Sequence, residues 1–315
     1  MARSGTTNFT VSATSVINRA LALVSERSAE VPFQDEEVND ALSTLNMMVK
    51  AWMADGLHLW TREEGVLFLR TGVSKYNLGG SSGDHATTED DFVDTTITAA
   101  AVTGANTITV ASTANMTASD NIGIELDDGT RQWTTIVSVD SSTGLTLTDT
   151  LTDDVAIGRT VFTYTTVIEK PVRVETSRRR LMSDNSDIEM NEWARQQYMA
   201  QPDKTSQGTP TNFYFSPEYT FGVMYVWQTA SSVNQVVKFT FQRTIQNFDT
   251  VSDNPDFPQE WALALVYNLA ALIGHEYDCP LQKLGMIKQE AMMLKDQVLG
   301  FDTEKVEMKM EPDFS

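Results

Sequence analysis

The sequence predicts an α+β fold: a helical bundle made from the N- and C-terminal helices, a β-rich middle, and an inserted small all-β barrel or sandwich domain. Two observations predict it. Apolar residues recur every three or four positions near both ends of the chain, which is typical of helices that bury one face. Between them, residues 95–163 are rich in Thr, Val, Ile, Asp and Ser and lack that periodicity, which favours short strands.

Two helices are predicted near the N-terminus. The first covers Ser12–Ser25, and Ser12 or Thr14 can cap it because a hydroxyl accepts a hydrogen bond from a free backbone N–H. The second opens at Asp35, with acidic residues in the first turn where the helix dipole favours them, and its apolar positions run to Trp52.

A helical hairpin is predicted at Trp261–Leu299. Pro258 suits the first turn of its first helix, Pro280 forces a break between the two helices, and Gly300 stands where the second is expected to stop. Two helices cannot bury their own apolar faces, so we expect the N-terminal helices to pack on the hairpin and close a bundle.

Short apolar runs predict the strands of the β-rich middle. The expected strands are Leu59–Trp60, Val66–Leu69, Val73–Leu78, Lys170–Val174, Thr211–Phe215, Gly222–Trp227 and Val233–Phe241. Ile188–Ala200 is predicted as a helix. Gly79–Asp94 contains Gly, Ser, Thr and Asp without periodicity, and is predicted to be a linker.

Residues 81–163 are predicted to form an inserted acidic β-domain. Its expected strands are Thr107–Ala111, Ile122–Leu126, Gln132–Val139, Leu145–Thr148 and Thr160–Tyr164. Trp133, the only tryptophan of this segment, is expected to pack inside it. The segment has 13 acidic residues against Arg131 and Arg159, a net charge of −11. The rest of the chain would form a core from residues 1–80 and 164–300, followed by a C-terminal tail at 301–315.

The chain has a formal net charge of −20 and a single cysteine, Cys279. Strong acidity disfavours tight binding of nucleic acid, because phosphate affinity comes from Lys and Arg. It suits solubility, or a surface along which DNA slides without sticking. One cysteine excludes an intrachain disulfide. The sequence has no apolar run of membrane-spanning length and no secretory signal pattern, so we expect an unsecreted product without membrane insertion.

No catalytic site, metal site or cofactor is predicted, and we do not expect an enzyme. The sequence has no glycine-rich phosphate loop after a strand. The three histidines, His58, His85 and His275, lack metal-ligand spacing from one another. His275 and Glu276 stand close to Cys279, but a packed or partly exposed helix end is favoured over a metal cluster there.

Three groups of residues are candidates for interactions. Arg178, Arg179 and Arg180 form the only basic triplet, and could line a ring channel, meet an acidic partner, or form a solvated or intersubunit salt-bridged turn. The tail residues Lys305, Met308, Met310 and Phe314 could fold on a partner or be a disordered end. The helix residues Trp52, Trp261 and Tyr267 belong either to the core or to a subunit interface.

Several segments, taken in order, resemble the head-to-tail adaptor family of short-tailed phages, also described as tail accessory factors or packaged-DNA stabilisation proteins. The segments are VINRALALV (Val16–Val24), EEVNDALSTLNMMVKAWMADGLHLW (Glu36–Trp60), TREEGVLFL (Thr61–Leu69), YNLGG (Tyr76–Gly80), KPVRV (Lys170–Val174), SRRRL (Ser177–Leu181), GTPTNFYFSP (Gly208–Pro217), GVMYVW (Gly222–Trp227) and PQEWALALVYNLA (Pro258–Ala270). No single piece is specific, whereas their common order is. The acidic segment between Gly80 and Lys170 departs from the family pattern and leaves the role of the insert open.

The resemblance implies a virion protein at the head-tail junction, made in the host cytoplasm. Twelve subunits would form a ring beneath the portal protein, with the helices as its wall and the C-terminal tail reaching the portal. The β-part would face the next tail protein, a nozzle or tail tube, and double-stranded DNA would pass through the channel without sequence recognition. Two alternatives stay open: a tail-associated host-adhesion or carbohydrate-binding protein acting through the β-insert, and a tail-carried peptidoglycan hydrolase.

Overall fold

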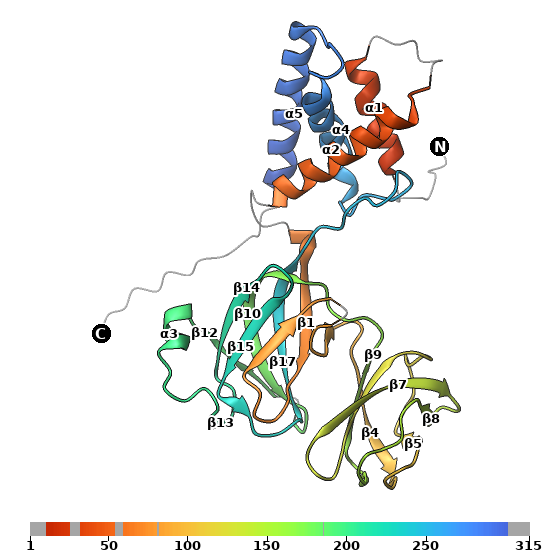
Figure 1. Cartoon of the computed structure of the whole chain (residues 1–315), viewed down its shortest axis with the longest axis vertical. Coiled ribbons are helices and arrows are strands. Elements are labelled where there is room, and N and C mark those ends of the chain that lie inside the picture. Colours follow the sequence, from red (N-terminus) through yellow and green to blue (C-terminus); the bar gives the residue numbers. More distant parts are fainter. Residues whose placement is uncertain (1–10, 26–31, 54–58, 81, 185, 302–315) are drawn as a thin grey trace, which may run out of the picture. The chain divides into compact units, whose positions relative to one another are not determined.

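The computed structural model describes residues 11–25, 32–53, 59–80, 82–184 and 186–301. Its fold is mixed α+β, with helices near both ends of the chain and a β-rich middle that includes a closed six-stranded barrel (Figure 1). These features of the predicted fold class are confirmed. The chain divides into two compact units, Met1–Thr61 with Ile245–Ser315, called the helical unit, and Arg62–Thr244, called the β-unit. The strands of the predicted core therefore belong to the same unit as the barrel.

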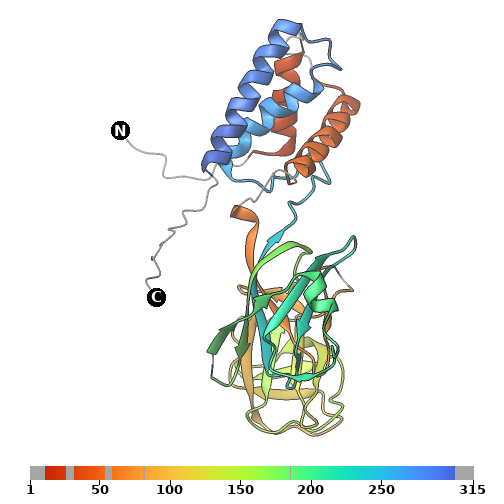
Figure 2. The same ribbon diagram turned by 90° about the vertical axis from the view of Figure 1, so that its left-hand side faces the viewer.

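The helical unit has helices at the four predicted places. They are α1 (Ala13–Val24), α2 (Asp35–Met53), α4 (Ala262–Ile273) and α5 (Leu281–Phe301), with short 3₁₀ turns η1 (Leu59–Thr61) and η2 (Gln259–Trp261). Buried residues of all four helices belong to one hydrophobic cluster, and Figure 2 shows these helices packed on one another. The N- and C-terminal segments thus share a core.

Local chemistry explains where the helices of this unit begin. The Ser12 hydroxyl accepts a hydrogen bond from the Ser15 N–H at 3.3 Å and caps α1, as predicted. In α2, the Glu37 carboxylate accepts from the Gln34 N–H at 2.8 Å. Two other expectations were wrong. Leu59–Trp60 lies in the turn η1 and not in a strand, because Trp60 packs on Trp261. Helix α5 runs through Gly300 to Phe301, past the glycine at which it was expected to end.

Most of the β-unit is a sandwich of two sheets. The first has the order β11-β10-β17-β1-β3 and the second β12-β14-β15-β2. The first sheet comprises β1 (Arg62–Phe68), β3 (Ala86–Thr88), β10 (Pro171–Leu181), β11 (Ser186–Glu189) and β17 (Gln235–Arg243). The second comprises β2 (Lys75–Leu78), β12 (Asn191–Glu192), β14 (Asn212–Pro217) and β15 (Gly222–Trp227). Their facing residues, among them Leu67, Phe239, Phe213 and Met224, form one buried cluster.

Outside the sandwich and the barrel, the described elements of the β-unit are a short helix, α3 (Arg195–Met199), and a small pair of strands, β13 (Gln207–Gly208) and β16 (Thr229–Ala230). The predicted helix at Ile188–Ala200 was wrong over its first half. Ser186–Glu189 forms β11 and pairs with Arg178–Leu181, so tertiary pairing overrides a weak helical pattern. The predicted linker at Gly79–Asp94 contains β3, which pairs with β1.

The barrel closes in the order β4-β5-β8-β7-β6-β9. Its strands are β4 (Val93–Ala99), β5 (Thr107–Val110), β6 (Asn121–Glu125), β7 (Arg131–Val139), β8 (Gly144–Leu147) and β9 (Thr160–Tyr164). Five of the six were predicted, and β4 was missed. Trp133 lies outside the barrel core, which was not expected. It packs with Phe68 of the sandwich, because the indole and its neighbours fill the junction between barrel and sheet.

Candidate functional site

The arginine triplet lies within strand β10 and not in a turn. Successive side chains of a strand point to opposite faces. Arg179 shares the inner face of the sandwich with its partner Val237, whereas Arg178 pairs with Lys238 and Arg180 with Val236 on the outer face. The structure therefore separates the three arginines into two groups.

The two outer arginines of the triplet are bound to carboxylates of the same sheet. Arg180 donates to both oxygens of Asp187 at 2.6 and 2.7 Å, a bidentate contact. Arg178 donates to Glu64 at 3.0 Å. The hydrogen bond from Arg180 holds the pKa of the Asp187 carboxyl below its usual value and raises the pKa of Arg180. These positive charges are compensated within the chain.

The rest of this outer face continues the same pattern. Lys238 is buried and forms an ion pair with Glu89, and Thr240 donates to Glu64 at 2.6 Å. A shallow hollow of about 360 Å³ beside them is lined by Arg62 and the four carboxylates of Glu63, Glu64, Glu89 and Asp90. The cations named on this face are thus paired with carboxylates. The triplet had suggested a free basic surface instead.

The opposite end of the same outer face carries the barrel. His85 stacks on Trp133 with ring centroids 3.9 Å apart, and its Nδ1 lies 2.6 Å from the Tyr164 hydroxyl. Burial at this junction lowers the pKa of His85 to about 4 and raises the pKa of the Tyr164 phenol. Phe68 and Phe162 complete the aromatic contact. All three aromatic residues of the barrel strands, Trp133, Phe162 and Tyr164, face this junction.

Arg131 makes a second set of contacts between the barrel and the rest of the β-unit. Its guanidinium lies 3.8 Å from the centroid of the Phe162 ring and donates to the backbone carbonyls of Gly123 at 2.9 Å and Val233 at 3.1 Å. Burial lowers the pKa of Arg131 to about 9. Nearby, Asn234 donates to the Glu125 carboxylate at 3.0 Å. The barrel is therefore fastened by polar contacts as well as by aromatic packing.

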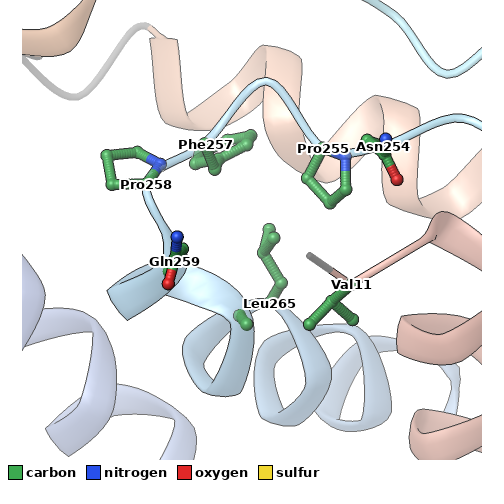
Figure 3. A pocket seen from close by; sticks show the side chains of 8 residues that line it. Val11, Asn254, Pro255, Phe257, Pro258, Gln259 and Leu265 are labelled. Carbon is green, nitrogen blue, oxygen red and sulfur yellow. The ribbon is translucent and has the colours of Figure 1, made fainter. Parts of the chain in front are cut away.

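The predicted helix residues lie in the core of the helical unit. Trp52 and Trp261 are buried with ring centroids 5.6 Å apart, and Tyr267 packs against the same cluster. Beside them is a hollow of about 230 Å³, in which Val11, Leu265 and Phe257 come together (Figure 3). Among the described residues that line it, the polar side chains are those of Asn254 and Gln259.

Two further hollows follow the first turns of α4. One, of about 430 Å³, is bounded by Arg19 of α1 and by Leu263 and Val266 of α4. The other, of about 250 Å³, lies between α4 and α5 and is lined by Leu263, Leu294 and Val298. Leu263 is 52% exposed. The apolar surface of α4 is therefore only partly covered.

Helix α5 carries exposed methionines that were missed as candidates. Met286 is 66% exposed and Met293 54% exposed, and they stand seven residues apart, which places them on one face of the helix. Met292 is 67% exposed as well. The seven-residue spacing was the available signal, but it does not distinguish a core face from a docking face.

Within the described part of the chain, the other predicted residues do not assemble into a metal-binding cluster. His275 Nε2 lies 2.9 Å from Lys288 Nζ, and Cys279 is buried. Among the described residues, no group of three His, Cys, Asp or Glu side chains is placed to hold a metal ion. Lys305, Met308, Met310 and Phe314 lie outside the described residues, as does His58.

Comparisons with known proteins assign no family. No protein-family model matches the chain, and a search of curated proteins gives no match. None of the helices in the described residues is both long and apolar enough to span a membrane. Any function must therefore be argued from the surfaces described above.

Proposed function

We propose that this chain is a head-to-tail adaptor of a phage virion. It would form a ring beneath the portal protein, extend the DNA channel, help to retain packaged DNA and provide the docking platform for the tail. The order of nine segments along the sequence supports this proposal, from Val16–Val24 to Pro258–Ala270.

The observation that carries the proposal is the uncovered apolar surface of the helical unit. Met286 and Met293 lie exposed on one face of α5, and Leu263 stands exposed between two hollows of α4. Large apolar side chains that stay exposed on a protein surface can mark an interaction site. In the proposal, the four helices form a bundle that makes the ring wall, and this surface meets the neighbouring subunits.

The charge distribution supports a channel along which DNA moves freely. The chain has a net charge of −20, and Arg178 and Arg180 of β10 are compensated by Glu64 and Asp187. An acidic surface with few free Lys and Arg gains little from releasing the counterions of DNA, so it binds DNA weakly. DNA would therefore be enclosed by the ring and not held by tight contacts.

Host adhesion through the barrel is a less favoured function. Ligand sites are usually lined by aromatic and other apolar side chains. The aromatic residues of the barrel strands are used at the junction with the sandwich, where Trp133 stacks on His85. They are thus not presented to a sugar.

The proposal is tested by electron microscopy of the purified chain mixed with the cognate portal protein. We expect rings stacked on portal rings, with the symmetry of the bound chain matching a twelve-subunit assembly. A portal protein lacking its tail-facing surface serves as the control and should remain bare. A chain that leaves the intact portal bare at tens of micromolar would contradict the proposal.

A further inference from the structure

Arg179 is a buried arginine without a partner. It is 6% exposed, and it makes no hydrogen bond or ion pair with any described residue. Its Nε is buried and has no acceptor. The half-buried arginines of the described chain all have partners. They are Arg62, Arg131, Arg159, Arg178, Arg180 and Arg243.

An uncompensated buried charge is costly, because the protein interior does not replace the water that the guanidinium loses. The other members of the triplet show the usual solution, since Arg178 and Arg180 each contact a carboxylate. Arg179 faces the inner side of the sheet, away from Glu64 and Asp187. Arg179 thus has no carboxylate partner among the described residues, and only the Nε of its guanidinium is fully buried without an acceptor.

Gln235 is a second unsatisfied polar side chain on the same face. It is 6% exposed, and its Oε1 is buried without a donor. In the register of the sheet, Arg179 lies opposite Val237, and Gln235 is two residues further along β17, opposite Leu181. Diagonal neighbours of this kind are about 7–8 Å apart, within reach of long side chains. A half-turn of the Gln235 amide exchanges Oε1 for Nε2 and presents a donor instead.

The sheet is open beside these two residues. Strand β11 is the edge of its sheet, and Ile188, which pairs directly with Arg179, is 50% exposed although it lies on the same face. The second sheet therefore leaves this margin of the sandwich uncovered. A small group can approach Arg179 from this margin.

We propose that Arg179 and Gln235 form a binding site for a carboxylate at the β11 edge of the sandwich. The planar guanidinium matches the two oxygens of a carboxylate, and the Gln235 amide supplies another donor. A single negative charge balances Arg179, whereas a phosphate dianion would leave an excess charge in a buried site. The carboxylate is either a free small molecule or an acidic side chain of a second copy. The site does not depend on the proposed ring function.

The test compares the thermal midpoint of the full chain in sodium formate and in sodium chloride at equal ionic strength. We expect 100 mM formate to raise the midpoint of the dilute wild-type protein by at least about 2 °C relative to chloride. Arg179→Met should lose this shift. Arg173→Met is the matched control, since Arg173 is an exposed arginine of the same strand, and it should keep the shift.

Sedimentation at increasing protein concentration tests the second source of the carboxylate. If a second copy supplies it, association is weakened by formate and by Arg179→Met but not by Arg173→Met. If Arg179→Met fails to fold, as judged by circular dichroism, Arg179→Lys replaces it and should weaken either effect because it lacks the planar fork. The site is overturned if neither formate nor association distinguishes the Arg179 variant from the Arg173 variant.

Discussion

The barrel and the helical unit differ in how much of their strand edges and apolar side chains a single chain covers. Closure of the barrel leaves no strand edge unpaired, and its aromatic residues are used at the junction with the sandwich. Its exposed apolar side chains include those of Val102, Val137 and Val139, and single exposed aliphatic side chains are normal for a protein surface. The helical unit instead exposes Met286 and Met293 on a single helix face, and Leu263 of α4 is exposed as well.

This difference indicates where partners are to be expected. The most distinctive part of the sequence is the acidic insert, yet the structure shows it to be a closed module tied down by Trp133 and Arg131. The helices have a less distinctive sequence, but they leave more large apolar side chains exposed. We therefore propose that assembly uses the helical unit, and we treat the barrel as a module attached to the sandwich.

Charges placed on the exposed apolar residues of the helical unit and of the barrel test this difference most directly. Met286→Lys with Met293→Lys should abolish ring formation or weaken it at least about tenfold, because a buried unpaired charge at an interface costs more than 1.4 kcal/mol. The matched control is Val102→Lys with Val137→Lys, since these barrel residues have the same exposed fractions, 66% and 53% against 66% and 54%. Sedimentation velocity measures both. Equal loss of rings in the two variants would show that the helical surface has no special role.

Removing Trp133 tests whether the junction holds the barrel to the sandwich. Trp133→Ala should lower the free energy of unfolding of the β-unit by about 3 kcal/mol, at the low end for a Trp→Ala change because the indole is only half-buried. Urea unfolding followed by circular dichroism measures the loss. A cost below about 1 kcal/mol would mean that the stack on His85 contributes little.

The junction should also be sensitive to acid. The pKa of His85 is lowered to about 4 in the folded state, so between pH 6.5 and 4 the unfolded state binds a proton that the folded state does not. Stability from this group is therefore complete above pH 6.5 and falls as the pH drops towards 4. We expect the free energy of unfolding to fall by about 2 kcal/mol over this pH range, a value already reduced because His85 is partly exposed. His85→Phe should remove this part of the pH dependence in urea titrations at pH 7.5 and 5; an unchanged slope would contradict the assignment.

The smallest effect is expected at the paired arginines of the outer sheet face. Arg180→Gln should cost at most about 1 kcal/mol, because its contact with Asp187 is partly exposed to solvent. It should not change retention of DNA by the assembled ring. Arg173→Gln on the same strand, which has no partner among the described residues, should leave stability unchanged. If Arg180→Gln released DNA while stability held, the triplet would be a channel contact after all.

The sequence predicted most helices and barrel strands because their periodicity is local. The helices near Val16, Leu45 and Leu269 bury one face, and the alternation in Gln132–Val139 is that of a strand. Ile188 was misassigned because its conformation depends on pairing with Arg179, which lies across the edge of a sheet and is invisible to a local pattern. The alternation of side chains along β10 places Arg179 on the inner face of the sheet and Arg178 and Arg180 on the outer face. The three arginines that are adjacent in sequence therefore do not form one basic cluster.

The candidate surfaces were predictable only in part. Trp52 and Trp261 were recognised as helix residues of the core or an interface, and the structure places them in the core. Trp133 was assigned to the interior of the barrel, because a sequence does not show which side of a closed strand faces another sheet. Met286 and Met293 have the spacing of core residues, and only the packing of α5 shows that they are exposed.

The mass of the complex between this chain and the cognate portal tests the central claim most directly. Each chain has a mass of 35.0 kDa, so a ring of twelve adds about 420 kDa to the portal. Mass photometry of the mixture should show that increase for the wild-type protein and for Val102→Lys with Val137→Lys, but not for Met286→Lys with Met293→Lys. A portal whose mass is unchanged by the wild-type chain would contradict the account.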